Sequence, residues 1–294
     1  MARGWGARPV LACALLLGGC VAEPAPVPGP VIAPAVVVGA QSVPAGMQYL
    51  YGSGEAAAIS IQAWNALTGY VEERVRQRPV SGVVLEEDAT LAAPRFASCD
   101  RKPYAAVFDV DETVLLNRGF EYDAASGRPY EDARWRAYEI TGGTTTVAVP
   151  GAKAGIDALR RLGVTVIFNS NRAAANVEAT RVAIERAGLG PAVHGETLFL
   201  KGDDNTGSLK DARRWRIADR YCVIAMGGDQ LGDFSDLFNA PATPAARRSA
   251  AEAPAVAGLW GRGWFVLPNP VYGTALKGTL DDIFPADARW APEP

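Results

Sequence analysis

Short apolar runs alternate with helical segments along this chain, and no other feature constrains the fold as strongly. Residues 104–109 and 164–169 are short and apolar, which is typical of strands that are buried on both faces. Residues 150–163 begin with a proline and end with a glycine, as expected of a helix. Buried strands separated by helices predict an α/β protein with a parallel sheet covered by helices on both faces.

The rest of the chain follows the same pattern. The other strands expected are residues 197–202, 221–229 and 263–273, and the other helices are residues 47–78, 174–189 and 208–220. Ser208 and Asp211 have the spacing of a capping box at the start of the last helix. Because ligands of open α/β sheets bind at the carboxyl ends of the strands, we expect the functional side chains there.

The first 19 residues have the pattern of a secretion signal. Two arginines precede the apolar stretch 10–17, which is too short for a bilayer that takes about 20 residues to cross. The letters LGGC ending at Cys20 resemble the lipobox of bacterial lipoproteins, which implies lipidation of that cysteine. Val21 after the cysteine implies the outer membrane, on its periplasmic or its surface side. An ordinary signal peptide with a chance cysteine is the alternative.

Residues 20–45 are rich in proline, alanine and valine, which predicts an extended tether. The tether would join the lipid anchor to one folded domain at residues 46–290. The chain has a net charge of −3, so no basic surface indicates a nucleic-acid partner.

Two aspartates, Asp109 and Asp111, follow the first buried strand in the sequence FDVDET. Burial of two like charges without partners would be costly, and a cation with a substrate at the sheet edge would remove that cost. For this pair alone, a plain surface turn after the strand is the alternative.

Polar groups follow the other predicted strands as well. Asp229 and Asp233 are four residues apart after one strand, and Ser170 and Asn171 follow another. Lys210 lies near the start of a helix, where backbone N–H groups and the helix dipole favour an anion. Four carboxylates, one ammonium and several neutral donors suit a divalent metal together with a phosphoryl group.

The order of these motifs (D-x-D-x-T, a strand ending in serine, a lysine, then D-x-x-x-D) resembles the haloacid dehalogenase superfamily. The chain is more narrowly similar to the class C acid phosphatases, the lipoprotein-e group of bacterial outer-membrane enzymes. The segments that carry this resemblance are FDVDETVLLN, NSNR, SLKDAR, GGDQLGDF, YLYGSGEAAAISIQAWNAL and VLPNPVYG. The resemblance covers roughly residues 48–285 and implies a Rossmann-like core of the haloacid dehalogenase type. It also leads us to expect a small, mainly helical cap region from residues 46–100 and 118–150.

The resemblance implies a role for each matching position. Asp109 corresponds to the nucleophile that forms an aspartyl-phosphate, and Asp111 to the acid/base that protonates the leaving oxygen and then activates water. The phosphate-binding positions are Ser170, Asn171 and Lys210. Lys201 is the alternative to Lys210, which we prefer because it follows the S-x-K pattern and lies 19 residues before Asp229.

The metal that the resemblance implies is Mg²⁺, because only oxygen ligands are on offer at the matching positions. Its protein ligands would be the carboxylates of Asp109 and Asp229 and the backbone carbonyl of Asp111, while Asp233 would orient metal-bound water. His194 is the only histidine of the chain, and we interpret it as a loop residue.

Trp135 and Tyr272 fall near the positions where related enzymes stack an aromatic ring of the substrate. The alternative is that both are ordinary core aromatics. Two departures from the family pattern bear on substrate preference: Gln230 stands where the group often has asparagine, and YGTALKG lacks a large residue soon after its glycine.

These features predict a Mg²⁺-dependent phosphomonoesterase of the acid phosphatase or 5′-nucleotidase type, anchored by lipid to the outer membrane. Its expected substrates are small organic phosphates such as 5′-nucleotides or nicotinamide mononucleotide. One alternative is a non-catalytic surface lipoprotein that binds a ligand, and another is a different phosphotransferase of the same superfamily, such as a mutase. The sequence is compatible with an oligomer and does not specify one.

Two cysteines of the domain precede the catalytic motifs. Cys99 lies ten residues before Asp109, and Cys222 lies seven residues before Asp229. In the superfamily's sheet the two strands concerned are neighbours, which would bring the cysteines within reach of a disulfide. The alternative is a buried free thiol at Cys222 and an exposed one at Cys99.

Overall fold

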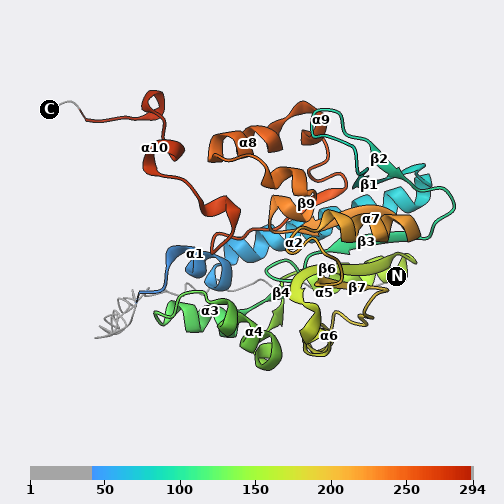
Figure 1. Cartoon of the computed structure of the whole chain (residues 1–294), viewed down its shortest axis with the longest axis horizontal. Helices are drawn as coiled ribbons and strands as arrows, with labels where there is room; N and C mark the ends of the chain where they lie inside the picture. The colour runs from blue at the N-terminus through green and yellow to red at the C-terminus, as the bar shows by residue number, and fades with distance from the viewer. Residues whose placement is uncertain (1–41, 293–294) are drawn as a thin grey trace, which may run out of the picture. The chain divides into compact units, whose positions relative to one another are not determined.

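The computed structural model describes residues 42–292. Its central element is a five-stranded parallel sheet with the strand order β7-β6-β3-β8-β9 (Figure 1). The strands are β3 (Tyr104–Phe108), β6 (Thr165–Ala173), β7 (Leu198–Lys201), β8 (Cys222–Gly228) and β9 (Trp264–Val266). The predicted α/β class and parallel sheet are therefore confirmed. The expected signal peptide, Cys20 and most of the tether lie outside the described residues.

Two strands differ in length from the prediction. β6 continues to Ala173, so Ser170 and Asn171 belong to the strand itself, where its pairing with β7 is irregular. β9 has only three residues, although we expected a strand over 263–273. Pro268 and Pro270 follow it, and a proline has no N–H group to donate to the next strand.

Both faces of the sheet are covered, because successive side chains of each buried strand point to opposite sides. In β3, Ala106 and Phe108 pack into one apolar cluster, while Ala105 and Val107 pack into another. The first cluster contains residues of α2 (Gly54–Gln77), α5 (Ala152–Arg161) and α6 (Val177–Arg186). The second contains residues of β1 (Ser81–Leu85), α7 (Asp211–Arg220) and α9 (Pro254–Ala257).

Residues 46–100 belong mainly to this core and not to the cap region in which we expected them. The ring of Trp64 in α2 packs on that of Phe108, with centroids 5.0 Å apart, and β1 pairs with β2 (Phe96–Ser98) against the second face. The single helix expected over residues 47–78 is divided. Short helical turns α1 (Ala45–Met47) and η1 (Gln48–Gly52) come first, and the Ser53 hydroxyl then caps α2.

Residues 118–150 form the small helical region that the sequence predicts, and we call this segment the cap region. It contains α3 (Arg118–Ala125), α4 (Asp132–Thr141) and the turn η2 (Gly142–Thr144). Strands β4 (Leu115–Leu116) and β5 (Val147–Ala148) pair antiparallel at its base. In Figure 1, α3 and α4 lie next to each other, apart from the strands of the sheet.

A disulfide joins Cys99, just after β2, to Cys222 at the start of β8, with their Cα atoms 4.4 Å apart. The sequence left open a disulfide between these cysteines or two free thiols, and the structure has the disulfide. Both cysteines lie at the amino side of the sheet, away from the strand ends where the acids cluster.

Helices α8 (Pro244–Glu252) and α10 (Leu280–Ile283) lie in the C-terminal part. No helix within residues 42–292 has the length and hydropathy of a membrane span.

Candidate active site

A cavity of about 940 Å³ opens at the carboxyl edge of the sheet, between the strand ends and the cap region, and we call it the main cavity. The predicted site residues in its wall are Asp109, Asp111, Trp135, Asn171, Lys210, Asp229, Asp233 and Tyr272. Ser170 is not in the wall, because it is fully buried in β6, where its hydroxyl accepts a hydrogen bond from the backbone N–H of Arg172. The topology thus brings to one place residues that lie up to 163 positions apart in the sequence.

Lys210 lies at the centre of a cluster of carboxylates. Its ammonium contacts the Asp109 carboxylate and donates to that of Asp233 at 2.7 Å. Carboxylate oxygens of Asp109, Asp229 and Asp233 all lie within 4.8 Å of one another, so the three could hold a metal ion. Lys201, the alternative lysine, is exposed at the end of β7 and has no ion pair with these acids.

The buried charges of this cluster shift one another's pKa values. Burial raises the pKa of Asp109 well above its usual range, and although Lys210 opposes this rise, Asp233 and Asp229 add to it. Burial and the charge of Asp233 raise the pKa of Asp229 to about 7. Burial alone would lower the pKa of Lys210, but the charges of Asp109 and Asp233 raise it. A divalent cation among the three carboxylates would relieve this mutual repulsion.

Asp229 is held by neutral donors. Its carboxylate accepts hydrogen bonds from the side-chain amides of Gln230 at 2.8 Å and Asn269 at 2.7 Å, and from the Thr113 hydroxyl at 3.3 Å. Gln230 therefore touches the metal-ligand candidate while it also lines the main cavity. The sequence reasoning missed Asn269. Thr113 is the threonine of the D-x-D-x-T motif, for which the sequence suggested a role in orienting the neighbouring loop or a plain turn or capping role.

The start of helix α7 differs from the prediction in two ways. The helix begins at Asp211 with Lys210 as its N-cap, so Ser208 and Asp211 do not form a capping box. Moreover, the backbone N–H groups of Lys210 and Asp211 donate to the carboxylate of Asp236 at 2.7–3.0 Å. An internal anion therefore occupies the helix end that we expected to favour a substrate anion.

Asp111 is oriented by two residues whose contribution the sequence reasoning missed. Its Oδ1 atom accepts hydrogen bonds from Arg172 Nε at 2.9 Å, Arg172 Nη2 at 2.7 Å and Asn117 Nδ2 at 2.9 Å. Arg172 is fully buried and also donates to Asn117 Oδ1 at 2.8 Å. Asn117 is the last residue of the motif FDVDETVLLN, and Arg172 is the last residue of NSNR. Their places in these motifs were the sequence signal that could have identified them as site residues.

Glu112, between Asp111 and Thr113, forms a second network that the sequence reasoning missed. It has a left-handed backbone conformation with φ of 55°, and its side chain is almost fully buried. The carboxylate accepts hydrogen bonds from the hydroxyls of Tyr51 and Tyr272 and from the backbone N–H of Asn117. It thereby ties η1 and the C-terminal segment around Tyr272 to the loop that carries Asp109 and Asp111.

Asn171, in the wall of the main cavity, is held by helix α7 and its preceding loop. Arg213 Nη2 donates to Asn171 Oδ1 at 2.8 Å, and Asn171 Nδ2 donates to the backbone carbonyl of Ser208 at 2.9 Å. The fully buried Arg213 also donates to the backbone carbonyl of Ser170. Arg213 therefore links the predicted phosphate-binding positions to the element that carries Lys210.

The two predicted stacking residues come from different parts of the chain. Trp135 of α4 packs edge-on against Phe120, with centroids 5.0 Å apart, and the Arg172 guanidinium lies 5.7 Å from its ring centroid. Tyr272 is partly exposed and is tethered through its hydroxyl to Glu112. Both line the main cavity, so neither is a purely internal core residue.

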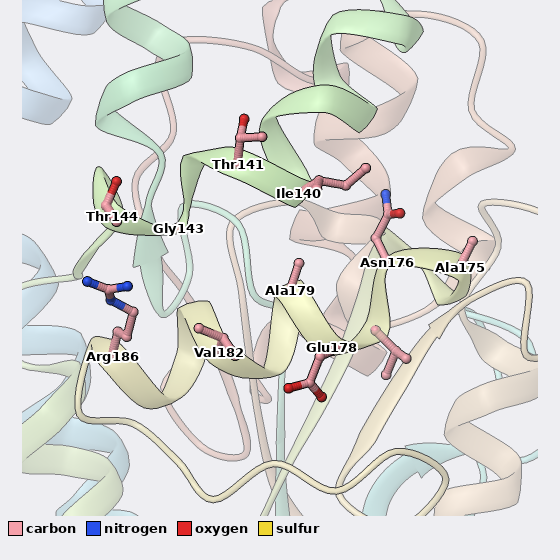
Figure 2. A pocket seen from close by; sticks show the side chains of 11 residues that line it. Ile140, Thr141, Gly143, Thr144, Ala175, Asn176, Glu178, Ala179, Val182 and Arg186 are labelled. Atoms are coloured by element: carbon pink, nitrogen blue, oxygen red, sulfur yellow. The ribbon is translucent and has the colours of Figure 1, made fainter.

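A second cavity, of about 570 Å³, lies between the end of α4 with η2 and the helix α6 (Figure 2). None of the predicted site residues lines it, and its acid, Glu178, pairs with Arg181. His194 lies outside both cavities, and its ring nitrogen Nε2 is hydrogen-bonded to the carboxylate of Asp203.

Comparisons with known proteins identify a family for the chain and solved structures with a similar fold. The family described as HAD superfamily, subfamily IIIB (Acid phosphatase), matches residues 53–275. The class C acid phosphatase from Bacillus anthracis has a similar structure, with 22% sequence identity and a TM-score of 0.64, over 78% of this chain and 84% of that chain. The structure of a Bacillus anthracis class C acid phosphatase with tungstate bound matches with a TM-score of 0.61, the same identity and the same coverage. Among curated proteins, the search found no match.

Proposed function

Because the chain belongs to the subfamily IIIB acid phosphatases of the HAD superfamily, we propose that it is a Mg²⁺-dependent phosphomonoesterase that works through an aspartyl-phosphate on Asp109. One observation carries the proposal. The Asp109 carboxylate lies buried against the Lys210 ammonium, beside Asp229 and Asp233, in a cavity that is large enough for a small organic phosphate.

The residues of the cluster fit a divalent cation. Three ionised carboxylates and one ammonium leave an excess of two negative charges in a buried place, which Mg²⁺ would neutralise. Asp109, Asp229 and the backbone carbonyl of Asp111 would hold the ion, and Asp233 would hold its water. Bound there, Mg²⁺ would supply charge stabilisation for the phosphoryl oxygens.

The first step is attack by the Asp109 carboxylate on phosphorus. Lys210 keeps this carboxylate in place and lies where it can stabilise the negative charge of the phosphoryl group. The bond from phosphorus to the ester oxygen breaks as the bond to Asp109 forms. The departing oxygen takes a proton from the carboxylic acid of Asp111, whose side chain lies in the wall of the same cavity.

The second step is hydrolysis of the aspartyl-phosphate. Asp111, now a carboxylate, takes a proton from water as that water attacks phosphorus, and inorganic phosphate leaves with Asp109 restored. Arg172 and Asn117 keep Asp111 in one orientation through both steps.

We propose 5′-nucleotides and nicotinamide mononucleotide as the substrate class. The support is the position of Trp135 and Tyr272, which line the main cavity together with the catalytic acids. An aromatic ring can stack on either side chain, and stacking is worth about 1–3 kcal/mol per base in nucleic-acid binding.

Release of inorganic phosphate tests the function directly. The protein is incubated with p-nitrophenyl phosphate, a panel of 5′-nucleotides and glycerol phosphate, with Mg²⁺ or with a chelator. We expect Mg²⁺-dependent release from several of these esters. Binding without release would favour a non-catalytic lipoprotein, and transfer of phosphate to a second organic molecule without release to water would favour a mutase.

We also propose that lipid on Cys20 anchors the enzyme at the outer membrane, as the lipobox resemblance of residues 17–20 suggests. In a bacterial host, the wild-type protein should fractionate with outer membranes and be extracted by detergent. The Cys20→Ser variant should be found in the soluble periplasmic fraction, and equal fractionation of the two proteins would contradict the anchor.

A further inference from the structure

One carboxyl group in the wall of the main cavity has no partner. Glu121 of α3 is only 6% exposed, and its side chain makes no hydrogen bond or ion pair within residues 42–292. The other two buried glutamates of this region are satisfied: Glu112 accepts from two tyrosine hydroxyls, and Glu139 accepts from Asn176 and the backbone N–H of Ala173. Neither carboxylate oxygen of Glu121 is among the fully buried atoms that lack a partner, so both are open to the cavity, where a hydrogen-bonding group of a ligand can reach them.

The position of Glu121 points to the leaving group as its missing partner. Phe120, Ala124 and Trp135 line the same cavity and provide apolar surface around it. The phosphoryl group must lie at Asp109, so the alcohol part of the ester occupies the remainder of the cavity, of which Glu121 is part of the wall. This reasoning rests on the proposed phosphatase function.

Hydroxyl groups match Glu121 better than cations do. Burial raises the pKa of Glu121 to about 7, so the group is an acid below neutrality and a carboxylate above it. A hydroxyl can pair with both forms, whereas a cation would lose its attraction to the acid form.

We propose that Glu121 is a specificity-determining residue that hydrogen-bonds hydroxyl groups of the leaving group, so that phosphate esters of sugars are preferred to esters without such hydroxyls. The two oxygens of the carboxyl group suit two adjacent hydroxyls, as in a ribose. A hydrogen bond to a charged group contributes about 1.5–3 kcal/mol, which corresponds to a preference of roughly 10- to 100-fold in kcat/KM.

The test compares adenosine 5′-monophosphate with its 2′,3′-dideoxy analogue, which differs only in the two hydroxyls. We expect the wild type to prefer the ribonucleotide about 10- to 100-fold in kcat/KM. In Glu121→Leu the preference should fall to about one, because the variant binds the ribonucleotide more weakly and the dideoxy analogue at least as well. Tyr122→Ala is the matched control: Tyr122 is the next residue of α3, 77% exposed and outside the cavity wall, so this variant should keep the wild-type preference.

A melting curve separates this role from a structural one. Leucine replaces an unpartnered buried carboxyl group, so Glu121→Leu should melt at or above the wild-type temperature. If the leucine variant does not fold, Glu121→Gln serves in its place, and its preference should fall part of the way because glutamine still offers one acceptor.

Several results would overturn the inference. They are equal kcat/KM of the wild type on the two nucleotides, an unchanged preference in Glu121→Leu, or loss of p-nitrophenyl phosphate hydrolysis in that variant. Hydrolysis of p-nitrophenyl phosphate by the wild type with equal rates on both nucleotides would reject the role of Glu121 alone. No phosphate release from any ester would reject the proposed function together with it.

Discussion

The sheet edge and the cap region form opposite walls of one cavity, and their side chains are held very differently. At the sheet edge, Asp111 and Asp229 each accept three hydrogen bonds from neighbouring side chains. In the cap region, Trp135 is held mainly by ring packing, Tyr130 is largely exposed, and Glu121 has no polar partner among the described residues. In Figure 1, the two short helices α3 and α4 of the cap region lie next to each other, apart from the strands of the sheet.

This difference indicates which side chains find their partners within the protein and which are left for a ligand to contact. Parallel strands fix their carboxyl ends through several ladders at once, so groups placed there keep one geometry, which phosphoryl transfer requires. In the cap region, Glu121 has no polar partner among the described residues and Trp135 lines the main cavity, so the leaving group of the ester can contact both. Changes at the sheet edge should therefore alter the rate of chemistry, whereas changes in the cap region should alter the choice of ester.

The strongest test removes the proposed nucleophile. Asp109→Asn keeps the side-chain shape but removes the attacking charge, so kcat should fall by at least about 10⁴-fold on every ester. Single-turnover experiments with quenched samples should also show no acid-stable phosphoprotein. The expected loss is independent of the leaving group, and activity within tenfold of the wild type would disprove the mechanism.

Arg172→Met tests whether the orientation of Asp111 matters. The variant removes two hydrogen bonds to Asp111, and we expect kcat to fall about 10- to 100-fold on alkyl phosphates, whose leaving oxygen needs a proton. The loss should be much smaller on p-nitrophenyl phosphate, because its leaving group departs without protonation. Arg160→Met is the control, since Arg160 donates to the backbone carbonyls of residues 189–191 far along the chain from the acids. Equal losses on both esters would reduce Arg172 to a structural role.

Trp135→Ala addresses the cap side of the comparison. We expect KM for 5′-nucleotides to rise about tenfold, in keeping with the loss of 1–3 kcal/mol of stacking, while kcat on glycerol phosphate changes little. Trp290→Ala, in which an 85% exposed tryptophan outside the cavity wall is removed, should match the wild type on both substrates. A fall in kcat with unchanged KM would mean that Trp135 contributes to the chemical step. It would contradict the assignment of ester choice to the cap region and of reaction rate to the sheet edge.

The smallest expected effect is on stability, and it concerns the acids of the sheet edge. The pKa of Asp229 is about 7 in the folded chain against an ordinary value of 3.8. Between these values the folded protein holds a proton that the unfolded chain releases, so metal-free stability should fall as the pH rises from about 4 to about 7. Melting temperatures with a chelator should drop by a few degrees over this range, and Mg²⁺ should reverse the drop at pH 7.

Asp229→Asn provides the control for the pH effect. Asparagine does not titrate, so the metal-free variant should lose part of the pH dependence and most of the stabilisation by Mg²⁺. Asp109, whose pKa lies well above its usual range, and Glu112 and Glu121, whose pKa values burial raises to about 7, should supply the part that remains. If the melting temperature of the wild type changed neither with pH nor on addition of Mg²⁺, this would argue against a metal site at these acids.

Much of the fold followed from local pattern, and the failures have local causes. The five parallel strands could be expected because buried strands are apolar throughout, and helices do lie within residues 118–150. Residues 46–100 were misplaced because an amphipathic helix such as α2 looks the same whether it covers a sheet or a cavity. The capping box at Ser208 failed because Lys210 and Asp211 donate their backbone N–H groups to Asp236, which lies 26 and 25 residues further along the chain.

By itself, the sequence determined which residue types stand at the strand ends, because a charge directly after an apolar run can lie only at the edge of a buried sheet. Tertiary structure alone decided which groups pair there. Asp111 meets Arg172 from 61 residues away, and Glu112 meets Tyr272 from 160 residues away. It also decided that Glu121 meets no partner at all among the described residues, since the packing of α3 against the rest of the chain sets what surrounds that side chain. Partners so distant in the chain are chosen by the packing of whole elements, and no local pattern records that choice.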